Sequence, residues 1–222
     1  MCGRFDLHAE PTVILKEFRV DHFAIDYSPS YNIAPTRQIV VVKDDGKRYL
    51  SQCRWGFLPS WTEDPNSGYK MINVRAETVA EKPAFQDAFR FRRCLVVADG
   101  FFEWRQEGKT KQPVYIRLKS QRLFGFASLY NIWKSPEGEE ICTCTIITVD
   151  ANELLIAIHD RMPAIIAKDK EDLWLNPANS DKGGLMSLLV LYPSEEMEIY
   201  DVSLIVNKPE NDSPEIINPV TL

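Results

Sequence analysis

The chain has 222 residues, of which 45% are hydrophobic and 26% are charged, and its formal net charge is −6. This composition predicts a globular protein, and the absence of a signal-peptide pattern or a bilayer-length apolar run leads us to expect a cytoplasmic location without membrane contact. The acidic balance argues against phosphate binding over the whole surface, although a local basic groove remains compatible with it.

A cysteine stands directly behind the initiator methionine, in the segment MCGRF. Removal of Met1 would give Cys2 a free α-amine next to its thiol, which makes the residue a 1,2-aminothiol. An α-amine has a pKa of ~7.7–8.0, against ~10.4 for lysine, so a useful fraction of it is neutral at physiological pH.

The remaining four cysteines lie in strand-like runs, where a buried cysteine usually acts as a small hydrophobic residue. They are Cys53, Cys94, Cys142 and Cys144. The total of five, without a C-x-x-C pair, argues against a disulfide framework and against a zinc ribbon.

The predicted elements are mostly strands. Residues 11–19 predict a short helix that begins at Pro11 and turns Ile14 and Phe18 to one side. Residues 37–55 alternate around an Asp-Asp-Gly turn, which predicts a β-hairpin. We expect further strands at 94–104, 113–119, 123–133 and 142–150, and short helices at 82–90, 151–158 and 169–175.

These elements show no regular alternation of strands and helices. They predict an α+β fold with a largely antiparallel, barrel-like sheet and short inserted helices, in a single domain over 1–222. The Pro/Asn/Asp-rich stretch 207–219 is expected to be a tail on the surface.

The segment MINVRAETVA places polar residues in a row on one face of an expected strand at 71–77. Because side chains alternate along a strand, Asn73, Arg75 and Glu77 point away from the apolar face. Such a row is either the solvated face of a half-buried strand or part of a site, and the pattern alone favours the solvated face.

The segment ADGFFEWRQEG places Glu103 between Phe102 and Trp104. A carboxylate among aromatic side chains is partly desolvated, which raises its pKa toward neutrality and suits it to carry a proton. The alternative is a strand-edge glutamate whose carboxylate reaches water.

His159 follows the expected helix at 151–158 and precedes Pro163. At a helix C-terminus the dipole would favour the imidazolium form, although a lone histidine is more often structural. In RWGFLPSW, Trp61 is a candidate for stacking on unpaired bases, whereas Trp55 and Phe57 are expected in the core.

Taken together, seven segments resemble the SRAP family of SOS-response-associated peptidases, or abasic-site processing proteins, in the family's order over nearly the whole chain. They are MCGRF (1–5), YNIAPT (31–36), RWGFLPSW (54–61), INVRAET (72–78), ADGFFEW (98–104), KQPVYI (111–116) and IHDRMP (158–163).

The resemblance implies a protein that senses abasic sites in single-stranded DNA and forms a covalent thiazolidine cross-link through Cys2 after Met1 is removed, with self-removal of Met1 and lyase activity as further expectations. It implies a monomer, associated with the nucleoid when bound to DNA, that uses neither a cofactor nor a metal ion. The implied catalytic residues are Cys2, Asn73, Glu103 and His159, and the implied DNA-binding residues are Arg4, Asn32, Pro35, Trp61, Arg75 and Arg161.

Two other functions stay open at this point. In a cysteine peptidase or N-terminal-nucleophile hydrolase, Cys2 would attack a carbonyl with His159 as its base. In a non-covalent module for single-stranded DNA, Cys2 would have no chemical role and binding would be reversible and sensitive to salt.

Overall fold

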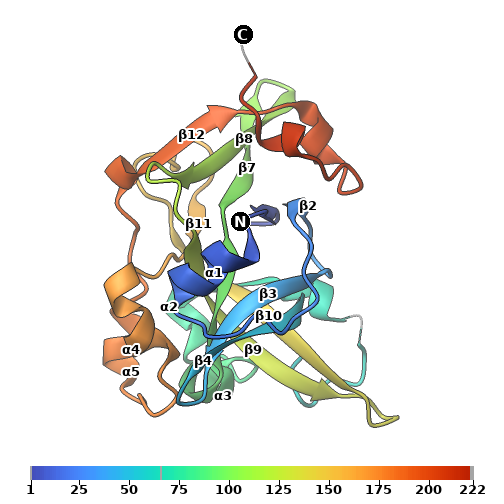
Figure 1. Ribbon diagram of the computed structural model, residues 1–222, viewed down its shortest axis with the longest axis vertical. Helices are drawn as coiled ribbons and strands as arrows, with labels where there is room; N and C mark the ends of the chain where they lie inside the picture. Colours follow the sequence, from blue (N-terminus) through green and yellow to red (C-terminus); the bar gives the residue numbers. More distant parts are fainter. Residues whose placement is uncertain (1, 66, 221–222) are drawn as a thin grey trace.

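The computed structural model describes residues 2–65 and 67–220, and the strands of this part of the chain, β1 to β12, all lie in two sheets (Figure 1). The larger sheet curls into a closed five-stranded barrel of order β10-β4-β3-β6-β9, because β9 pairs again with β10. Its members are β3 (Gln38–Asp44), β4 (Arg48–Trp55), β6 (Arg93–Ala98), β9 (Phe124–Lys134) and β10 (Glu140–Asp150), with β5 (Asn73–Arg75) and β11 (Arg161–Pro163) paired to β10 outside the ring.

Most pairs in this sheet are antiparallel, as the sequence predicts. The exceptions are β4 and β5, which both run parallel to β10, so the barrel closes through one parallel seam. At this seam Arg54 is opposite Thr143, and farther along β10 Asn73 is opposite Ile146.

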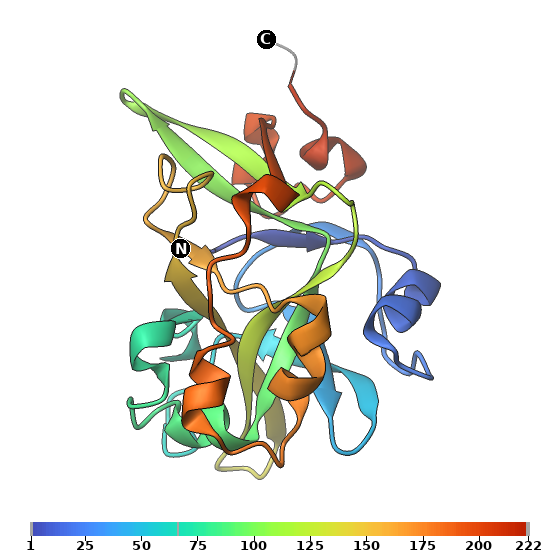
Figure 2. The ribbon, with the colours of Figure 1, turned by 90° about the vertical axis from the view of Figure 1, so that its left-hand side faces the viewer.

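The second sheet has five strands, among them the first and the last strand of the described residues. Its order is β12-β8-β7-β1-β2, formed by β1 (Phe5–Leu7), β2 (Ser30–Ile33), β7 (Gly100–Glu107), β8 (Thr110–Leu118) and β12 (Met197–Asp201). Figure 2 shows β1, in dark blue, crossing between the barrel below and the β7–β8 hairpin above. Asp99 is the only residue between β6 and β7, so the chain passes from barrel to second sheet at this point.

The helices are short and lie around the sheets. They are α1 (Pro11–Phe18), α2 (Ala76–Val79), α3 (Gln86–Phe91), α4 (Glu171–Leu175) and α5 (Lys182–Met186). Within the described ranges, no helix has the length and apolar character needed to cross a membrane.

The core anchors the first strand firmly. The Phe5 ring makes edge-to-face contacts with Trp55, at a centroid distance of 5.2 Å, and with Phe126, at 5.9 Å. All three side chains are buried, and burial of a large apolar side chain stabilises a fold by about 1.5–3 kcal/mol. The position of Cys2, three residues before Phe5, is therefore fixed by core packing.

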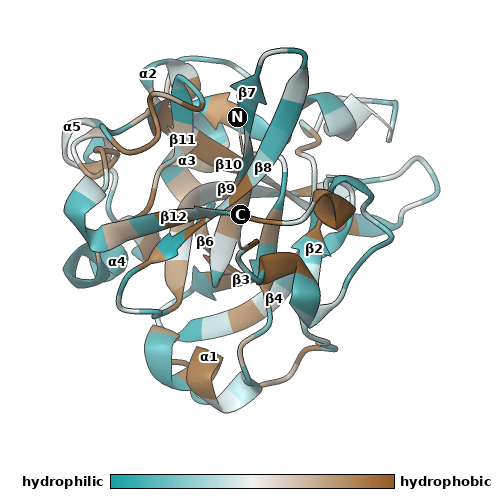
Figure 3. Cartoon of the chain, turned by 90° about the horizontal axis from the view of Figure 1, so that it is seen from above, coloured by the Kyte–Doolittle hydropathy of each residue, from teal (hydrophilic) through white to brown (hydrophobic). Residues whose placement is uncertain are grey.

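A smaller apolar cluster lies on the other face of β7. Side chains alternate along β7, so Phe101 faces the main core while Phe102 faces this cluster. The cluster consists of Phe102, Tyr115, Val202, Val206 and Ile216. In Figure 3, β8 and β12 are largely hydrophilic, whereas more hydrophobic strands lie beneath them.

The predicted fold class, the helix at 11–19 and the hairpin at 37–55 are confirmed. The single strand expected at 94–104 is wrong, because the chain changes sheets at Asp99 and forms β6 and β7 instead. The surface tail expected at 207–219 is also wrong, since Ile216 is fully buried in the smaller cluster.

Two further expectations are wrong. Residues 151–158 form successive turns instead of a helix, with Asn152 Oδ1 accepting a hydrogen bond from the Leu155 N–H group. The structure also contains a disulfide between Cys53 of β4 and Cys142 of β10, across the parallel seam of the barrel. Cys94 and Cys144 are buried and free, as expected.

Candidate active site

Cys2 is fully buried at the start of the described chain, where β5 holds its main chain in place. The Asn73 side-chain amide donates a hydrogen bond of 2.7 Å to the Cys2 carbonyl oxygen. The Cys2 thiol in turn lies 3.9 Å from the Arg4 carbonyl oxygen. Asn73 is held by the parallel pairing of β5 with β10, so this pairing helps to determine where Cys2 lies.

Glu103, on β7, is a second buried residue near Cys2. Its side chain is only 4% exposed, and burial raises the pKa of its carboxyl above the ordinary value. The register of β7 against β8 places Glu103 opposite Val114, so this carboxyl group belongs to a paired part of the second sheet. The predicted desolvation of Glu103 is confirmed.

The electrostatics link three of the predicted catalytic residues. Burial and then the charge of Glu103 raise the pKa of the Cys2 thiol well above its ordinary value. Beyond the effect of burial, the charge of His159 lowers the pKa of Glu103, and the charge of Asp160 raises it. Such effects require proximity, so the Cys2 thiol and His159 both lie near Glu103, and Asn73 is hydrogen-bonded to the Cys2 main chain.

His159 lies in the turn between β10 and β11, so the expected dipole of a preceding helix does not act on it. Its Nδ1 lies 2.8 Å from Asp160 Oδ1 and also accepts a hydrogen bond of 2.9 Å from the Arg161 N–H group. When Nδ1 accepts that bond, a neutral imidazole carries its proton on Nε2. Protonation of Nδ1 would favour the Asp160 contact instead.

Asp160 is the functional candidate that the sequence interpretation missed. It contacts His159 and its charge raises the pKa of Glu103, so it acts on two of the predicted catalytic residues. The signal was present in the segment IHDRMP, where Asp160 stands between His159 and Arg161.

Arg4 and Asn32 connect the start of the chain to its C-terminal segment. Arg4 Nη1 donates to Asn32 Oδ1, at 2.6 Å, and to the Val206 carbonyl oxygen, at 2.9 Å. The Asn32 amide donates to the carbonyl oxygens of Val206, Lys208 and Asn211. Asn32 is fully buried, so its side chain faces protein on all sides, while Arg4 is half-buried.

Arg161 is likewise occupied by protein partners. Its guanidinium group forms a two-pronged ion pair with Glu77, at 2.9 and 3.0 Å, and a third contact with Asp150 at 2.5 Å. The side chain is 7% exposed. It thereby joins α2 to both ends of the 151–160 turn region, which contains His159.

Three of the remaining DNA-binding candidates lie at or near the surface. Arg75 is exposed at the end of β5, two residues from Asn73, and Pro35 is partly buried in the turn after β2. Trp61 is 63% exposed, whereas Trp55 and Phe57 are core residues, as predicted.

Close backbone packing supports the segment that presents Trp61. A Cβ atom on Gly56, whose φ is +135°, would lie 2.8 Å from the Gly68 carbonyl oxygen. A side chain at either glycine would push these two segments apart. The Trp133 indole N–H group also donates to the Thr62 carbonyl oxygen at 2.8 Å, which fixes the chain next to Trp61.

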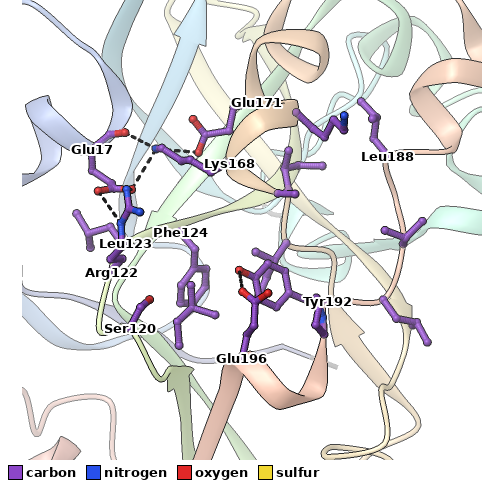
Figure 4. Close-up of a pocket in the computed structure, with 18 of the residues that line it drawn as sticks. Glu17, Ser120, Arg122, Leu123, Phe124, Lys168, Glu171, Leu188, Tyr192 and Glu196 are labelled. Atoms are coloured by element: carbon purple, nitrogen blue, oxygen red, sulfur yellow. Dashed lines mark hydrogen bonds and ion pairs between the residues drawn. The ribbon is translucent and has the colours of Figure 1, made fainter.

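A separate cavity of about 500 Å³ lies away from these residues, between the end of α1, the start of β9 and the chain around Tyr192 (Figure 4). Four of its six charged side chains pair with one another, because Lys168 contacts Glu17 and Glu171 while Arg122 contacts Glu17. Its lining contains none of the candidate catalytic residues.

Comparison with known proteins gives close relatives over the full length of the fold. The chain is 49% identical to the abasic site processing protein YoqW of Bacillus subtilis (strain 168), with 98% of this chain and 99% of the relative covered. It is 33% identical to the abasic site processing protein HMCES of Xenopus tropicalis, with 88% and 68% covered.

A crystal structure of a protein from Bacteroides thetaiotaomicron matches with a TM-score of 0.87 at 29% identity, covering 99% of this chain and 100% of that one. The family described as SOS response associated peptidase (SRAP) matches residues 1–209. This match spans nearly the whole fold, and the chain therefore belongs to the SRAP family.

Proposed function

We propose that this protein recognises abasic sites in single-stranded DNA and bonds covalently to them through Cys2 after Met1 has been removed. The observation that carries the proposal is the position of the Cys2 main chain, held by Asn73 beside the buried carboxyl group of Glu103. The relatives YoqW and HMCES bear the name abasic site processing protein, which supports DNA with abasic sites as the target.

The reaction uses both nucleophiles of an N-terminal cysteine. The α-amine of Cys2 attacks the C1′ aldehyde of the ring-opened sugar, and loss of one water gives an imine. The thiol then adds to the imine carbon while its proton passes to the imine nitrogen, which closes a five-membered thiazolidine. The sum is aminothiol plus aldehyde giving thiazolidine plus water, without oxidation or reduction.

Glu103 is assigned the proton transfers. Because burial raises the pKa of its carboxyl, Glu103 is a stronger base than an exposed glutamate when ionised, and it is protonated over a wider pH range. It takes a proton from the attacking amine and delivers one to the leaving oxygen. The Cys2 thiol, whose pKa is also raised, needs such a base during ring closure.

His159 is assigned to the opening of the sugar ring, which must precede attack on the aldehyde. Nδ1 contacts Asp160 and accepts a hydrogen bond from the Arg161 N–H group, so we assign the proton exchange with the sugar to Nε2. Asp160 acts as a positioning residue for the imidazole.

The DNA contacts fall into two groups. We assign direct contact to Arg75 and Arg4 for phosphates, to Trp61 for stacking on an unpaired base, and to Pro35 for packing at the groove edge. Asn32 and Arg161 are also part of this surface in our proposal, but their buried, hydrogen-bonded side chains support it from within.

Met1 lies outside the described residues, and its removal is part of the proposal. Only a chain that begins at Cys2 has the free amine that the imine step requires. The peptidase in the family's name fits a reaction in which the site cleaves off its own first residue.

The cysteine-peptidase alternative is disfavoured by one property of the site. A peptidase nucleophile needs a lowered thiol pKa, whereas burial and Glu103 raise the pKa of the Cys2 thiol. Aldehyde chemistry can start from the neutral amine and does not need a resting thiolate.

The test compares three single-stranded oligonucleotides on a denaturing gel: one with an abasic site, one with a tetrahydrofuran analogue that has no aldehyde, and one intact. Only the abasic oligonucleotide is expected to give a shifted protein band. Equal adduct with the tetrahydrofuran analogue would overturn the aldehyde chemistry, and reversible binding without any adduct would favour a non-covalent module.

A further inference from the structure

The disulfide between Cys53 and Cys142 lies beside a buried lysine. Lys43 of β3 is 5% exposed, and its Nζ lies 3.3 Å from Cys142 Sγ and 3.2 Å from Ser51 Oγ. The same ammonium group lies over the Tyr130 ring, 4.1 Å from the ring centroid. These residues belong to β3, β4, β9 and β10, so four of the five barrel strands surround one ammonium group.

Strand register brings the lysine and the cysteines together. Ser51 and Cys53 are alternate residues of β4, and the β3–β4 register places the face that they share beside Lys43. Cys142 and Cys144 are alternate residues of β10, and the parallel pairing of β10 with β4 gives Cys53 and Cys142 a Cα separation of 4.6 Å. The cluster is therefore a consequence of how the barrel closes.

The Lys43 ammonium group has no carboxylate partner within the described ranges. Burial lowers its pKa, the charges of Cys94 and Cys144 raise it, and no carboxylate contributes. A buried ammonium group without an anion is costly. A thiolate is the anion that the neighbouring side chains can supply, and the sulfur that contacts Nζ is that of Cys142.

The four cysteines of the barrel differ in access and in charge environment. Cys142 is partly exposed, whereas Cys53, Cys94 and Cys144 are fully buried. Burial raises the pKa of Cys94 to about 12 and raises that of Cys144 well above its ordinary value. A thiol beside a lysine ammonium group has a lowered pKa and reacts as the thiolate. Among these four, only Cys142 combines access with contact to the cation.

We propose that Cys53 and Cys142 are a reversible redox pair, in which Cys142 is the reactive thiol, Lys43 stabilises its thiolate, and Cys53 is the buried partner. The reactants are small thiols, dithiols and their disulfides. The proposal does not use Cys2 and does not depend on the function proposed for abasic sites.

The exchange with a small dithiol balances in two steps. One thiolate of the dithiol attacks Cys142 Sγ, the Cys53–Cys142 bond breaks, and Cys53 leaves as a thiolate that takes up a proton. The second thiolate of the dithiol then attacks the reagent sulfur of this mixed disulfide, and Cys142 leaves as a thiolate beside Lys43. The dithiol is oxidised to a cyclic disulfide and supplies both electrons, and one proton goes to solvent while Cys142 stays ionised.

The oxidised and reduced chains should differ in stability. The bond crosses the parallel seam, where the Gly56 N–H group also donates to the Cys144 carbonyl oxygen at 2.8 Å. It joins residues 89 positions apart, and such a cross-link restricts the unfolded chain. We therefore expect a higher Tm for the oxidised protein than for the reduced protein.

The first test maps the reactivity of each thiol. Protein that has been reduced with a dithiol and freed of it without air is alkylated with iodoacetamide between about pH 5 and 10, and mass spectrometry of its peptides gives the rate at each cysteine. We expect Cys142 to react with a midpoint below the ordinary thiol pKa of ~8.5. At pH 7 it should react at least roughly tenfold faster than Cys94 or Cys144.

Two lysine variants separate the role of the cation from a general effect of the fold. Lys43→Met keeps the length of the side chain and removes its charge, so the midpoint of Cys142 should rise by about one pH unit and its alkylation at pH 7 should slow roughly tenfold. Lys47→Met, at an exposed position in the turn of the same hairpin, is the matched control and should keep the parental profile.

The second test uses the parent protein alone, so it does not depend on how the variants fold. The protein is equilibrated at several ratios of dithiol to disulfide, quenched with acid, and alkylated under denaturing conditions. We expect three alkylated cysteines in the oxidised protein and all five in the reduced protein, with the missing pair mapped to Cys53 and Cys142.

Four results would overturn the proposal. They are five free thiols at every ratio, a disulfide that the dithiol does not open in the folded protein, an ordinary or raised midpoint for Cys142, and an unchanged midpoint in Lys43→Met.

Discussion

The Asn73 amide donates a hydrogen bond of 2.7 Å to the Cys2 carbonyl oxygen, which ties the first described residue to the strand that runs beside β10. This bond links a residue at the chain start to one 71 positions later. It orients the main chain of Cys2, and in our proposal that orientation directs the α-amine toward the sugar aldehyde.

Replacement of Asn73 by aspartate keeps the shape of the side chain and removes its donor. A hydrogen bond contributes a net ~0.5–1.5 kcal/mol, and the new carboxylate also repels the Cys2 carbonyl oxygen, so we expect adduct formation to slow by several-fold to about tenfold. Single-turnover rates on single-stranded abasic DNA measure this. Asn176→Asp, at an exposed position just after α4, is the matched control. Equal rates for the two variants would remove the orienting role from Asn73.

Glu103→Gln removes the proton carrier and keeps both nucleophiles. General acid–base assistance is typically worth ~10²–10⁴-fold, so the variant should react that much more slowly and still reach the same product mass. The plot of its rate against pH, between about pH 5 and 9, should lose the limb that is caused by titration of Glu103. It should follow the titration of the amine and the thiol instead. A parental rate with a parental pH profile would make Glu103 a structural residue.

The same substitution should stabilise the protein at neutral and alkaline pH. Burial raises the pKa of Glu103 in the folded state above its ordinary value of 4.5. In the pH interval between these two pKa values, the folded state binds more protons than the unfolded state. The free energy of unfolding therefore falls as pH rises through the interval. Glutamine stays neutral, so Glu103→Gln should melt at a higher temperature than the parent at pH 8, with the difference shrinking toward pH 4.

Thermal melts across this pH range test the sign, and Glu137→Gln at an exposed turn is the control, for which no such trend is expected. A Glu103→Gln variant that is less stable than the parent at pH 8 would show that the ionised carboxylate is stabilised in the fold.

Arg75→Ala should weaken DNA binding and reduce its dependence on salt. A phosphate contact releases counterions, so loss of one contact should lower the slope of log K against log[salt] by about 0.7–1. Arg122→Ala, at an exposed arginine beside the cavity of Figure 4, should leave the slope unchanged. Binding isotherms at several salt concentrations measure both variants, and an unchanged slope for Arg75→Ala would exclude it as a phosphate contact.

The sequence predicted elements well where local signals agree with the final packing. Pro11 begins α1, and Ile14 and Phe18 are its buried residues, because helix spacing and the position of proline act within one short segment. The hairpin of β3 and β4 was predictable for the same reason, because the alternation of apolar and polar residues and the turn motif both lie within one segment.

The failures lie where tertiary pairing outweighs the local pattern. Residues 151–158 have a helical apolar spacing, but β11 must return to pair with Val149 and its neighbours in β10, and turns accomplish this return. The Cys53–Cys142 disulfide joins residues 89 positions apart, and only the parallel seam of the barrel brings them together.

For the candidate site too, local motifs predicted some features, and tertiary packing determined others. The family motifs named Cys2, Asn73, Glu103 and His159, which the fold links through Cys2 and Glu103. They could not reveal that Asn32 is fully buried, because three of its four side-chain hydrogen bonds depend on how the distant C-terminal segment packs.

The central claim is that the free amine and the thiol of Cys2 both bond to the abasic sugar. Intact mass spectrometry after mixing the protein with a single-stranded abasic oligonucleotide tests it most directly, with borohydride added to half of each sample. We predict one adduct whose mass is the Met1-free chain plus the oligonucleotide minus one water, unchanged by borohydride because a thiazolidine contains no imine. Cys2→Ala should give no such borohydride-resistant product, whereas Cys94→Ala, at a buried free cysteine, should behave as the parent. An undiminished adduct of Cys2→Ala in the samples without borohydride, or an adduct on chains that retain Met1, would contradict the mechanism.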